Sequence, residues 1–223
     1  MPLSRRHFVA GAGVALLGIG YAAYDWYKTQ NSPKTQTTKS AATGSSNSVM
    51  DILENDNVLG DPKAPIGIVE YASLTCPHCA QFHNGAFSQL EENYVKTGKA
   101  FIIYRDFPLD QYAFQASVLA HSAGKDKFFA VLKILFSKQS EWTSATNPTD
   151  AIIAIGKIVG VSKAKFEEGI ADEKLGESIL LDRMVGSTDY GVSSTPTLFI
   201  NGEKYEGNRN FEELDAYLKN LNT

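Results

Sequence analysis

Two cysteines, Cys76 and Cys79, are the only ones in this chain of 223 residues, and Pro77 and His78 separate them. An apolar run over residues 66–74 predicts a buried strand directly before them, and helical spacing follows. Proline suits the first turn of a helix, because its missing N–H would have no partner there. We therefore expect Cys76 at a helix N-cap, with the positive end of the helix dipole facing its sulfur.

The chain ahead of this pair has a different character. Two arginines precede an uncharged stretch rich in Gly and Ala, which predicts an export signal or anchor over residues 1–27. Residues 4–9 resemble the twin-arginine export signal of bacteria. Residues 28–48 are polar and predict a disordered linker. The remainder carries 16 basic and 24 acidic side chains, a net charge of −8, which argues against nucleic acid as a partner.

The first half of the folded part, residues 49–111, contains two predicted strands and one helix. The strands cover residues 66–73 and 99–107, and the helix between them repeats an apolar residue at every fourth position before it ends near Gly98. This order predicts a parallel βαβ unit with a right-handed crossover.

Residues 112–189 show successive helical stripes and no strand pattern, so we expect an all-helical insertion with breaks at Gly124, Asn147 and Gly160. Two shorter helices are expected at its end, over residues 162–170 and 173–188. The second half, residues 190–223, resumes with strands at 197–201 and 204–206 joined by the tight turn Asn201-Gly202, and closes with a helix.

The dithiol chemistry follows from this placement. A Cys76–Cys79 disulfide can exchange with a substrate thiol through a mixed disulfide, and helix N–H groups stabilise the Cys76 thiolate. His78 can add a donor or a positive charge. Cys79, one turn inward, should be buried and serve as the resolving thiol. Glu70 interrupts an apolar strand, and we expect it to exchange a proton with Cys79, directly or through water.

Two motifs, Cys76-Pro77-His78-Cys79 and Ser194-Thr195-Pro196-Thr197, resemble the active-site and cis-proline motifs of DsbA-like thiol:disulfide oxidoreductases. Glu70 also matches the buried acid of that family. The resemblance covers roughly residues 57–221 and implies an α/β thioredoxin fold, βαβ plus ββα, with an all-helical insertion. It further implies a cis Pro196 that brings the Thr195 backbone against the disulfide as a substrate-binding edge.

The function implied is that of an exported, periplasmic oxidase that donates its disulfide to folding secreted proteins. No cofactor beyond the Cys76–Cys79 disulfide is expected. Reoxidation in this family comes from a membrane quinone-linked partner, and an N-terminal membrane tether is compatible with the predicted signal or anchor.

Several alternatives stay open at this point. A disulfide isomerase or reductase is the nearest, because Thr195 stands where oxidases often have Val. A structural disulfide is a weak alternative, since the loop is too short to stabilise much. A copper or zinc site could use Cys76, Cys79 and His83, although a fourth ligand is not evident. His83 and His121 are otherwise expected to be ordinary helix residues, and Glu70 could reach solvent from an edge strand.

Overall fold

The computed structural model describes residues 48–221. The predicted export signal or anchor, and the predicted linker up to residue 47, lie outside the described residues. In the described part, five strands form one mixed sheet in the order β1-β3-β2-β4-β5.

The strands are β1 (Asn57–Leu59), β2 (Ile66–Ala72), β3 (Ala100–Asp106), β4 (Thr197–Ile200) and β5 (Glu203–Lys204). The helices before the insertion are α2 (Pro77–Phe82), η1 (His83–Phe87), α3 (Ser88–Leu90) and η2 (Glu91–Val95). Those that follow are α4 (Gln111–Ser122), α5 (Lys125–Ser137), α6 (Gln139–Thr143), α7 (Pro148–Val159), α8 (Lys163–Ala171), α9 (Glu173–Asp189) and α10 (Phe211–Leu221).

The sheet confirms the predicted βαβ and ββα halves. Strands β2 and β3 are parallel over their full length, in a register that pairs Glu70 with Tyr104. Strand β4 runs antiparallel to β2 and forms a hairpin with β5. The short strand β1, which pairs antiparallel with β3, is not among the predicted elements, because three residues are too few to show a strand period.

The helical path that carries the cysteines contains two π-helical segments, η1 and η2. Four of its buried apolar residues, Phe82, Ala86, Leu90 and Tyr94, are spaced four apart. In an ideal α-helix, each step of four residues rotates about 40° past a full turn, so the stripe would drift. The wider π turns keep these four side chains on one side of the helix.

The insertion is helical throughout, as predicted, and its expected breaks fall at helix ends. Gly124 precedes α5 with φ of 86°, Asn147 caps the start of α7, and Gly160 ends α7 in the left-handed conformation. The two helices expected over residues 162–170 and 173–188 are α8 and α9, and their bounds agree with the prediction to within one residue. One detail differs, because helix α6 was not predicted.

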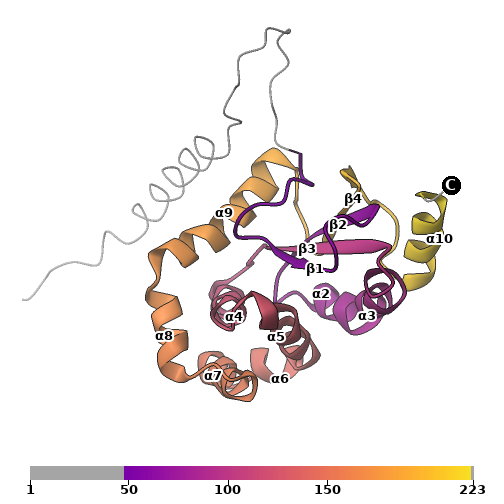
Figure 1. Ribbon diagram of the computed structural model, residues 1–223. Helices are drawn as coiled ribbons and strands as arrows, with labels where there is room; N and C mark the ends of the chain where they lie inside the picture. The colour runs from indigo at the N-terminus through magenta and orange to yellow at the C-terminus, as the bar shows by residue number, and fades with distance from the viewer. Residues whose placement is uncertain (1–47, 222–223) are drawn as a thin grey trace, which may run out of the picture. The chain divides into compact units, whose positions relative to one another are not determined.

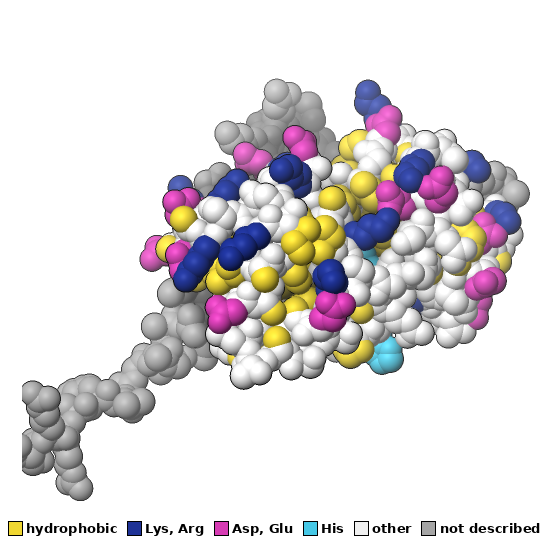
Figure 2. Space-filling model, turned by 90° about the horizontal axis from the view of Figure 1, so that it is seen from below, with side chains coloured by type: hydrophobic (Ala, Val, Ile, Leu, Met, Phe, Trp, Pro, Cys, Tyr) yellow, Lys and Arg dark blue, Asp and Glu magenta, His cyan; other side chains and the backbone are white. Residues whose placement is uncertain are grey.

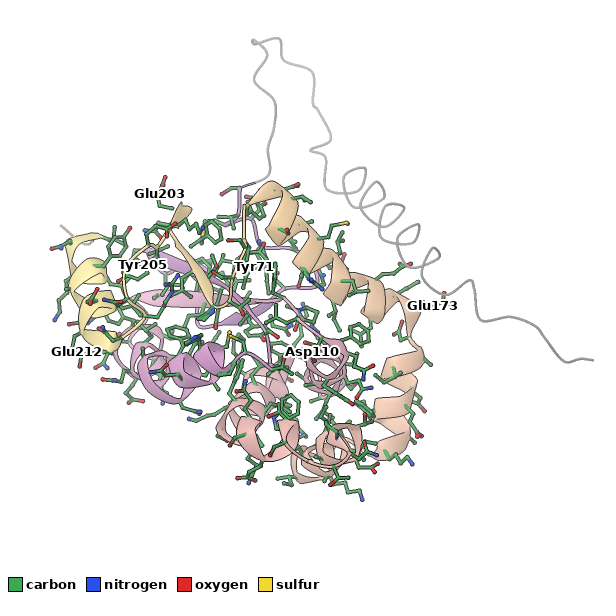
Figure 3. All side chains as sticks on the ribbon, turned by 180° about the vertical axis from the view of Figure 1, so that it is seen from behind. Tyr71, Asp110, Glu173, Glu203, Tyr205 and Glu212 are labelled. Atoms are coloured by element: carbon green, nitrogen blue, oxygen red, sulfur yellow. The ribbon has the colours of Figure 1, made fainter. Side chains whose placement is uncertain are left out.

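Helix α9 packs closely on the sheet at Gly186. A Cβ atom on Gly186 would lie 2.7 Å from the ring of Tyr71, a side chain of β2. Tyr71 is fully buried and is labelled in Figure 3. A glycine at this position therefore allows the helix to approach the sheet.

The sheet separates two layers (Figure 1). On one face, Ile66 and Ile68 of β2 pack with the helices that follow the cysteines and with α10. On the other face, Val69 and Tyr71 pack with residues near the start of the described chain and after α9. The insertion forms a further core that includes both cysteines. The dithiol thus lies where the first helix, the sheet and the insertion meet.

Arg105 on β3 ties the beginning of the folded chain to the sheet. Its side chain is 2% exposed and forms a bidentate ion pair with the Asp56 carboxylate, in which Nε and Nη2 donate to the two oxygens at 3.1 and 3.0 Å. It also donates to the backbone carbonyls of Val49 and Asp51, at 3.0 and 2.7 Å, and to the Tyr71 hydroxyl. A single buried side chain therefore fixes residues 49–56 against β3.

None of the helices within residues 48–221 is long and apolar enough to cross a membrane.

Figure 2 shows one face of the surface, on which hydrophobic side chains gather in the middle and Lys and Arg side chains lie around them.

Candidate functional site

Cys76 is the N-cap residue of α2, as the sequence predicts. Its backbone is extended, with φ of −76° and ψ of 119°, and Pro77 occupies the first turn. The Cys76 carbonyl accepts the first helical hydrogen bond, from the Ala80 N–H at 3.1 Å. The two cysteines are not joined by a disulfide, and Cys76 is 6% exposed whereas Cys79 is completely buried. Of the two sulfurs, that of Cys76 therefore lies nearer to solvent.

The surroundings of Cys76 lower the pKa of its thiol to about 5. The largest cause is a hydrogen bond from Cys79, against which burial acts in the opposite direction. A side-chain hydrogen bond from Thr195 and the backbone N–H groups of Cys79 and His78 lower it further. The expected contribution of His78 therefore comes through its backbone, while its side chain is exposed.

Cys79 has the opposite electrostatics. Burial raises the pKa of its thiol far above the ordinary range, and the hydrogen bond with Cys76 and the negative charge of Glu70 raise it further. The proton of this sulfur is therefore hard to remove, whereas the Cys76 sulfur loses its proton readily.

The loop before β4 faces the Cys76 sulfur. The Thr195–Pro196 peptide bond is cis, as the family resemblance implies. The Cys76 Sγ donates to the Thr195 carbonyl oxygen at 3.2 Å. While the Cys76 thiol donates to this carbonyl, the buried Thr195 hydroxyl has no hydrogen-bond partner among residues 48–221. The hydrogen bond from Thr195 that lowers the pKa of Cys76 is therefore one to the thiolate. When Cys76 is a thiolate and can only accept, this hydroxyl is available as a donor to it.

Glu70 lies on β2 in the middle of the sheet, and its side chain is completely buried. The alternative in which it reaches solvent from an edge strand is therefore wrong. Its carboxylate oxygens each lie 3.0 Å from Nε2 of His83, a residue 13 positions along the chain. The sequence gives no signal for this pair, because strand and helix periods alone do not show which side chains meet.

His83 occupies a closed aromatic site. Its ring stacks between Phe87, at a centroid distance of 4.2 Å, and Phe136 of α5, at 4.0 Å. Because Nε2 is engaged with Glu70, His83 does not join the two cysteines as the alternative metal site requires. Within the described chain, no group of three or more His, Cys, Asp or Glu side chains is arranged to hold a metal ion.

A second His–carboxylate pair lies at the end of β3, and it is only partly buried. His121 Nε2 is 2.7 Å from one oxygen of Asp106, whose other oxygen accepts from Ser117 at 2.5 Å. His83 and His121 thus both lie on helical segments, as expected, but His83 is buried, His121 is half-buried, and each has a carboxylate partner.

The insertion supplies contacts to the cysteine loop that sequence reasoning missed. The Gln139 side chain of α6, which is buried, donates to the carbonyls of Leu74 and Cys76, at 2.8 and 2.9 Å. Thr75 donates to Asp110 at 2.6 Å, and Asp110 caps the start of α4 (Figure 3). The insertion therefore holds the backbone on which the Cys76 sulfur is mounted.

Comparison with known proteins agrees with this geometry. The sequence matches the family described as Thioredoxin over residues 53–220. It is 31% identical, over 70% of this chain and 60% of the relative, to a Rickettsia bellii protein whose name gives it as a candidate protein-disulfide oxidoreductase. The chain thus spans about 60% of the length of that curated relative.

Two solved structures share the fold. The crystal structure of α-DsbA1 from Wolbachia pipientis aligns with a TM-score of 0.71 and 31% identity, over 76% of this chain and 92% of that one. A protein-disulfide isomerase from Novosphingobium aromaticivorans aligns with a TM-score of 0.67 and 23% identity, over 77% of this chain and the whole of that one. With its dithiol at the head of α2, its cis Pro196 and its helical insertion, this chain belongs to the thioredoxin family and is DsbA-like.

Proposed function

We propose that this protein donates the Cys76–Cys79 disulfide to the thiols of folding proteins in an oxidising compartment outside the cytoplasm. The observation that carries the proposal is that the surroundings lower the pKa of Cys76 and raise that of Cys79. Cys76 is held as a thiolate at the helix start, and Cys79 is held as a buried thiol. A pair arranged in this way is stabilised in its reduced form, so its disulfide is a strong oxidant.

The reaction proceeds in two exchanges. A substrate thiolate attacks the Cys76 Sγ, the intramolecular S–S bond breaks, and Cys79 leaves with the electron pair and takes up a proton. A second substrate thiolate then attacks the substrate sulfur of the mixed disulfide, and Cys76 leaves as a thiolate. The substrate loses two electrons and two protons, of which one proton stays on Cys79 and the other goes to solvent.

The Thr195 backbone offers the substrate a binding edge. It lies next to the Cys76 sulfur, and an extended substrate segment could pair with it as an added strand. Such pairing uses backbone groups, so it would admit many different sequences, as a general oxidant of folding chains requires.

The cellular setting is part of the same proposal. The arginine pair and apolar stretch at the N-terminus support export to a bacterial periplasm, where disulfides persist. A protein that gives up its disulfide must be reoxidised, and we assign this step to a membrane quinone-linked partner, as in the family that the chain resembles. A tether formed by residues 1–27 would keep it near such a partner.

The reduction potential decides between donor and reductant. The purified full chain would be equilibrated in a series of glutathione buffers, and its oxidation of a reduced two-cysteine peptide followed in parallel. We expect stoichiometric oxidation and a potential well above the roughly −270 mV of thioredoxin. A value near that of thioredoxin would favour a reductase and would refute the donor.

Thr195 supports a second candidate, a disulfide isomerase. A threonine before the cis proline resembles the isomerases, and its unpaired hydroxyl beside Cys76 could favour release of mixed disulfides. A substrate with scrambled disulfides separates the two candidates. An isomerase in its reduced form restores the native pairing of such a substrate, whereas a pure donor leaves it scrambled.

A further inference from the structure

A buried polar group of three side chains lies behind Cys79. It consists of Glu70 on β2, Tyr104 on β3 and His83 on η1. Glu70 and Tyr104 are register partners on neighbouring strands, so their side chains lie on the same face of the sheet. The Tyr104 hydroxyl is buried and has no hydrogen-bond partner in the described part of the chain. This group is therefore polar and enclosed, and the Tyr104 hydroxyl in it can still donate and accept hydrogen bonds.

His83 connects this group to the helix that carries the dithiol. Its backbone N–H donates to the Cys79 carbonyl, and its Nε2 lies 3.0 Å from each oxygen of Glu70. A carboxylate can only accept hydrogen bonds, so Nε2 must carry a proton toward it. The negative charge of Glu70 in turn acts on the Cys79 thiol. The His83 imidazole, the Glu70 carboxylate and the Cys79 thiol are thus coupled electrostatically, with Glu70 between the other two.

The surroundings of the imidazole can accommodate either of its charge states. The titratable groups that face it are Glu70 from β2, Tyr104 from β3 and Cys79 from α2, while η1 and α5 present the rings of Phe87 and Phe136. An imidazole has two ring nitrogens that can each carry a proton, so this side chain can give the proton on Nε2 to Glu70 and keep the one on Nδ1.

We propose that His83 is a positioning residue that acts through Glu70 to supply the proton that Cys79 takes up when the disulfide opens. The inference rests on the proposed function and deepens it. As the S–S bond breaks, the Nε2 proton of the imidazolium passes to the Glu70 carboxylate, and a carboxyl proton passes to the departing Cys79 sulfur. The products are a Cys79 thiol, a Glu70 carboxylate and a neutral imidazole that keeps its proton on Nδ1. Its bare Nε2 then faces the carboxylate, two acceptors without a proton between them, so Nε2 takes up a proton that solvent supplies.

The test is the pH dependence of disulfide reduction in the full chain. Dithiothreitol would reduce the Cys76–Cys79 disulfide at a series of pH values between 5 and 8, and the rates would be divided by the thiolate fraction of the reagent. In His83→Gln, the side chain can still donate to Glu70 but cannot titrate. We expect the corrected rate to fall about tenfold near pH 7 and to lose the dependence on pH that the parent protein shows.

His121→Gln is the matched control, since it removes the other histidine that pairs with a buried carboxylate, that of Asp106. Its corrected profile should follow that of the parent protein. If His83→Gln also keeps the parent profile, the proposal is overturned. The same holds if His121→Gln flattens the profile as strongly as His83→Gln, because the effect would then be a general loss of packing.

Two further variants keep the test decisive. His83→Phe preserves the aromatic stack with Phe87 and Phe136 and serves if the glutamine variant does not fold. In a Glu70→Gln background, His83→Gln should have little further effect, and multiplying effects would contradict action through Glu70. A parent disulfide that is inert to dithiothreitol would overturn the proposed function as well, whereas normal reduction with no dependence on His83 would overturn this inference alone.

Discussion

Cys76 and Cys79 lie three residues apart at the start of one helix, yet their surroundings treat the two sulfurs in opposite ways. The Cys76 sulfur receives hydrogen bonds from the helix start and from Thr195, while Cys79 faces the sheet and the charge of Glu70. The positions of the two cysteines in the helix already predict which sulfur is attacked and which is buried. The structure adds the groups that face each sulfur, and these groups decide the reactivity of the Cys-x-x-Cys motif.

Replacing Cys76 should have the largest effect. Cys76→Ala removes the sulfur that the substrate attacks, so we expect disulfide exchange with a peptide to fall by roughly a thousandfold or more. The measurement is oxidation of a two-cysteine peptide, followed by mass spectrometry. Appreciable exchange through Cys79 in this variant would show that the buried sulfur is reachable after all.

Replacing Cys79 should instead trap the intermediate. In Cys79→Ala, Cys76 remains a stabilised thiolate and can form a mixed disulfide, but no internal thiol can resolve it. We expect a covalent complex with an activated substrate disulfide to persist, visible as a shifted band on a non-reducing gel. If this variant and Cys76→Ala behaved alike, the assignment of the two roles would fail.

Acid titration of the reduced protein measures the pKa of the Cys76 thiol directly. With a pKa of about 5, the thiolate fraction in the reduced protein should be about 99% at pH 7 and about one half at pH 5, followed by absorbance near 240 nm. The oxidised protein is the blank. A midpoint above pH 7 would remove the basis for a strong oxidant.

The lowered pKa of Cys76 also predicts how the stability of the reduced protein changes with pH. The pKa of Cys76 is depressed below its unfolded value, near 8.5, so its stabilisation of the folded dithiol form is present above that value and is lost as the pH falls toward 5. Chemical unfolding of the reduced protein relative to the oxidised one should show a loss of several kcal/mol over this range. Above pH 8.5, the raised pKa of Cys79 acts in the opposite direction and weakens the reduced form.

A smaller change should sharpen the role of Thr195. Thr195→Val keeps the shape of the side chain but removes its hydroxyl donor, so the pKa of Cys76 should rise by about one unit, a tenfold change in thiolate stabilisation. The absorbance titration checks it, with Thr197→Val as a control. The Thr197 hydroxyl donates to the Ser194 carbonyl instead. An unchanged midpoint in Thr195→Val would mean that backbone groups alone stabilise the thiolate.

The smallest predicted effect on the sulfurs comes from the insertion. Gln139→Ala removes the buried hydrogen bonds to the Leu74 and Cys76 carbonyls, of which the Cys76 carbonyl keeps its bond from the Ala80 N–H, and this should cost about 1–3 kcal/mol of unfolding free energy. The Cys76 titration midpoint should move by less than in Thr195→Val. A larger movement of that midpoint would show that the insertion sets the chemistry as well as the loop geometry.

Much of the fold could be predicted because its determinants are local. The apolar runs of β2 and β3, the turn at Asn201-Gly202 and the helix breaks in the insertion each depend on residues close together in the chain. The three residues of β1 carry no such pattern and were missed.

The candidate site was predicted only in part, for the same reason. The cysteine motif and its N-cap are local, but Gln139 reaches Cys76 across 63 positions, and His83 meets Glu70 only because the first helix packs on the middle of the sheet. Such contacts depend on tertiary packing, for which a single sequence gives no spacing rule. The two motifs that lie far apart, at Cys76 and at Pro196, were connected through the family resemblance rather than through physical pattern.

The attachment of Arg105 to residues 49–56 has a mechanical consequence. A pull on the chain ahead of Val49 would be borne first by the guanidinium and its Asp56 carboxylate, and through them by β3, which has a neighbour on each side. The edge strand β1 would not be peeled away first. Shortening the chain to residue 57 would remove that carboxylate and leave the Arg105 charge buried without it, so the smallest stable unit should begin near Val49.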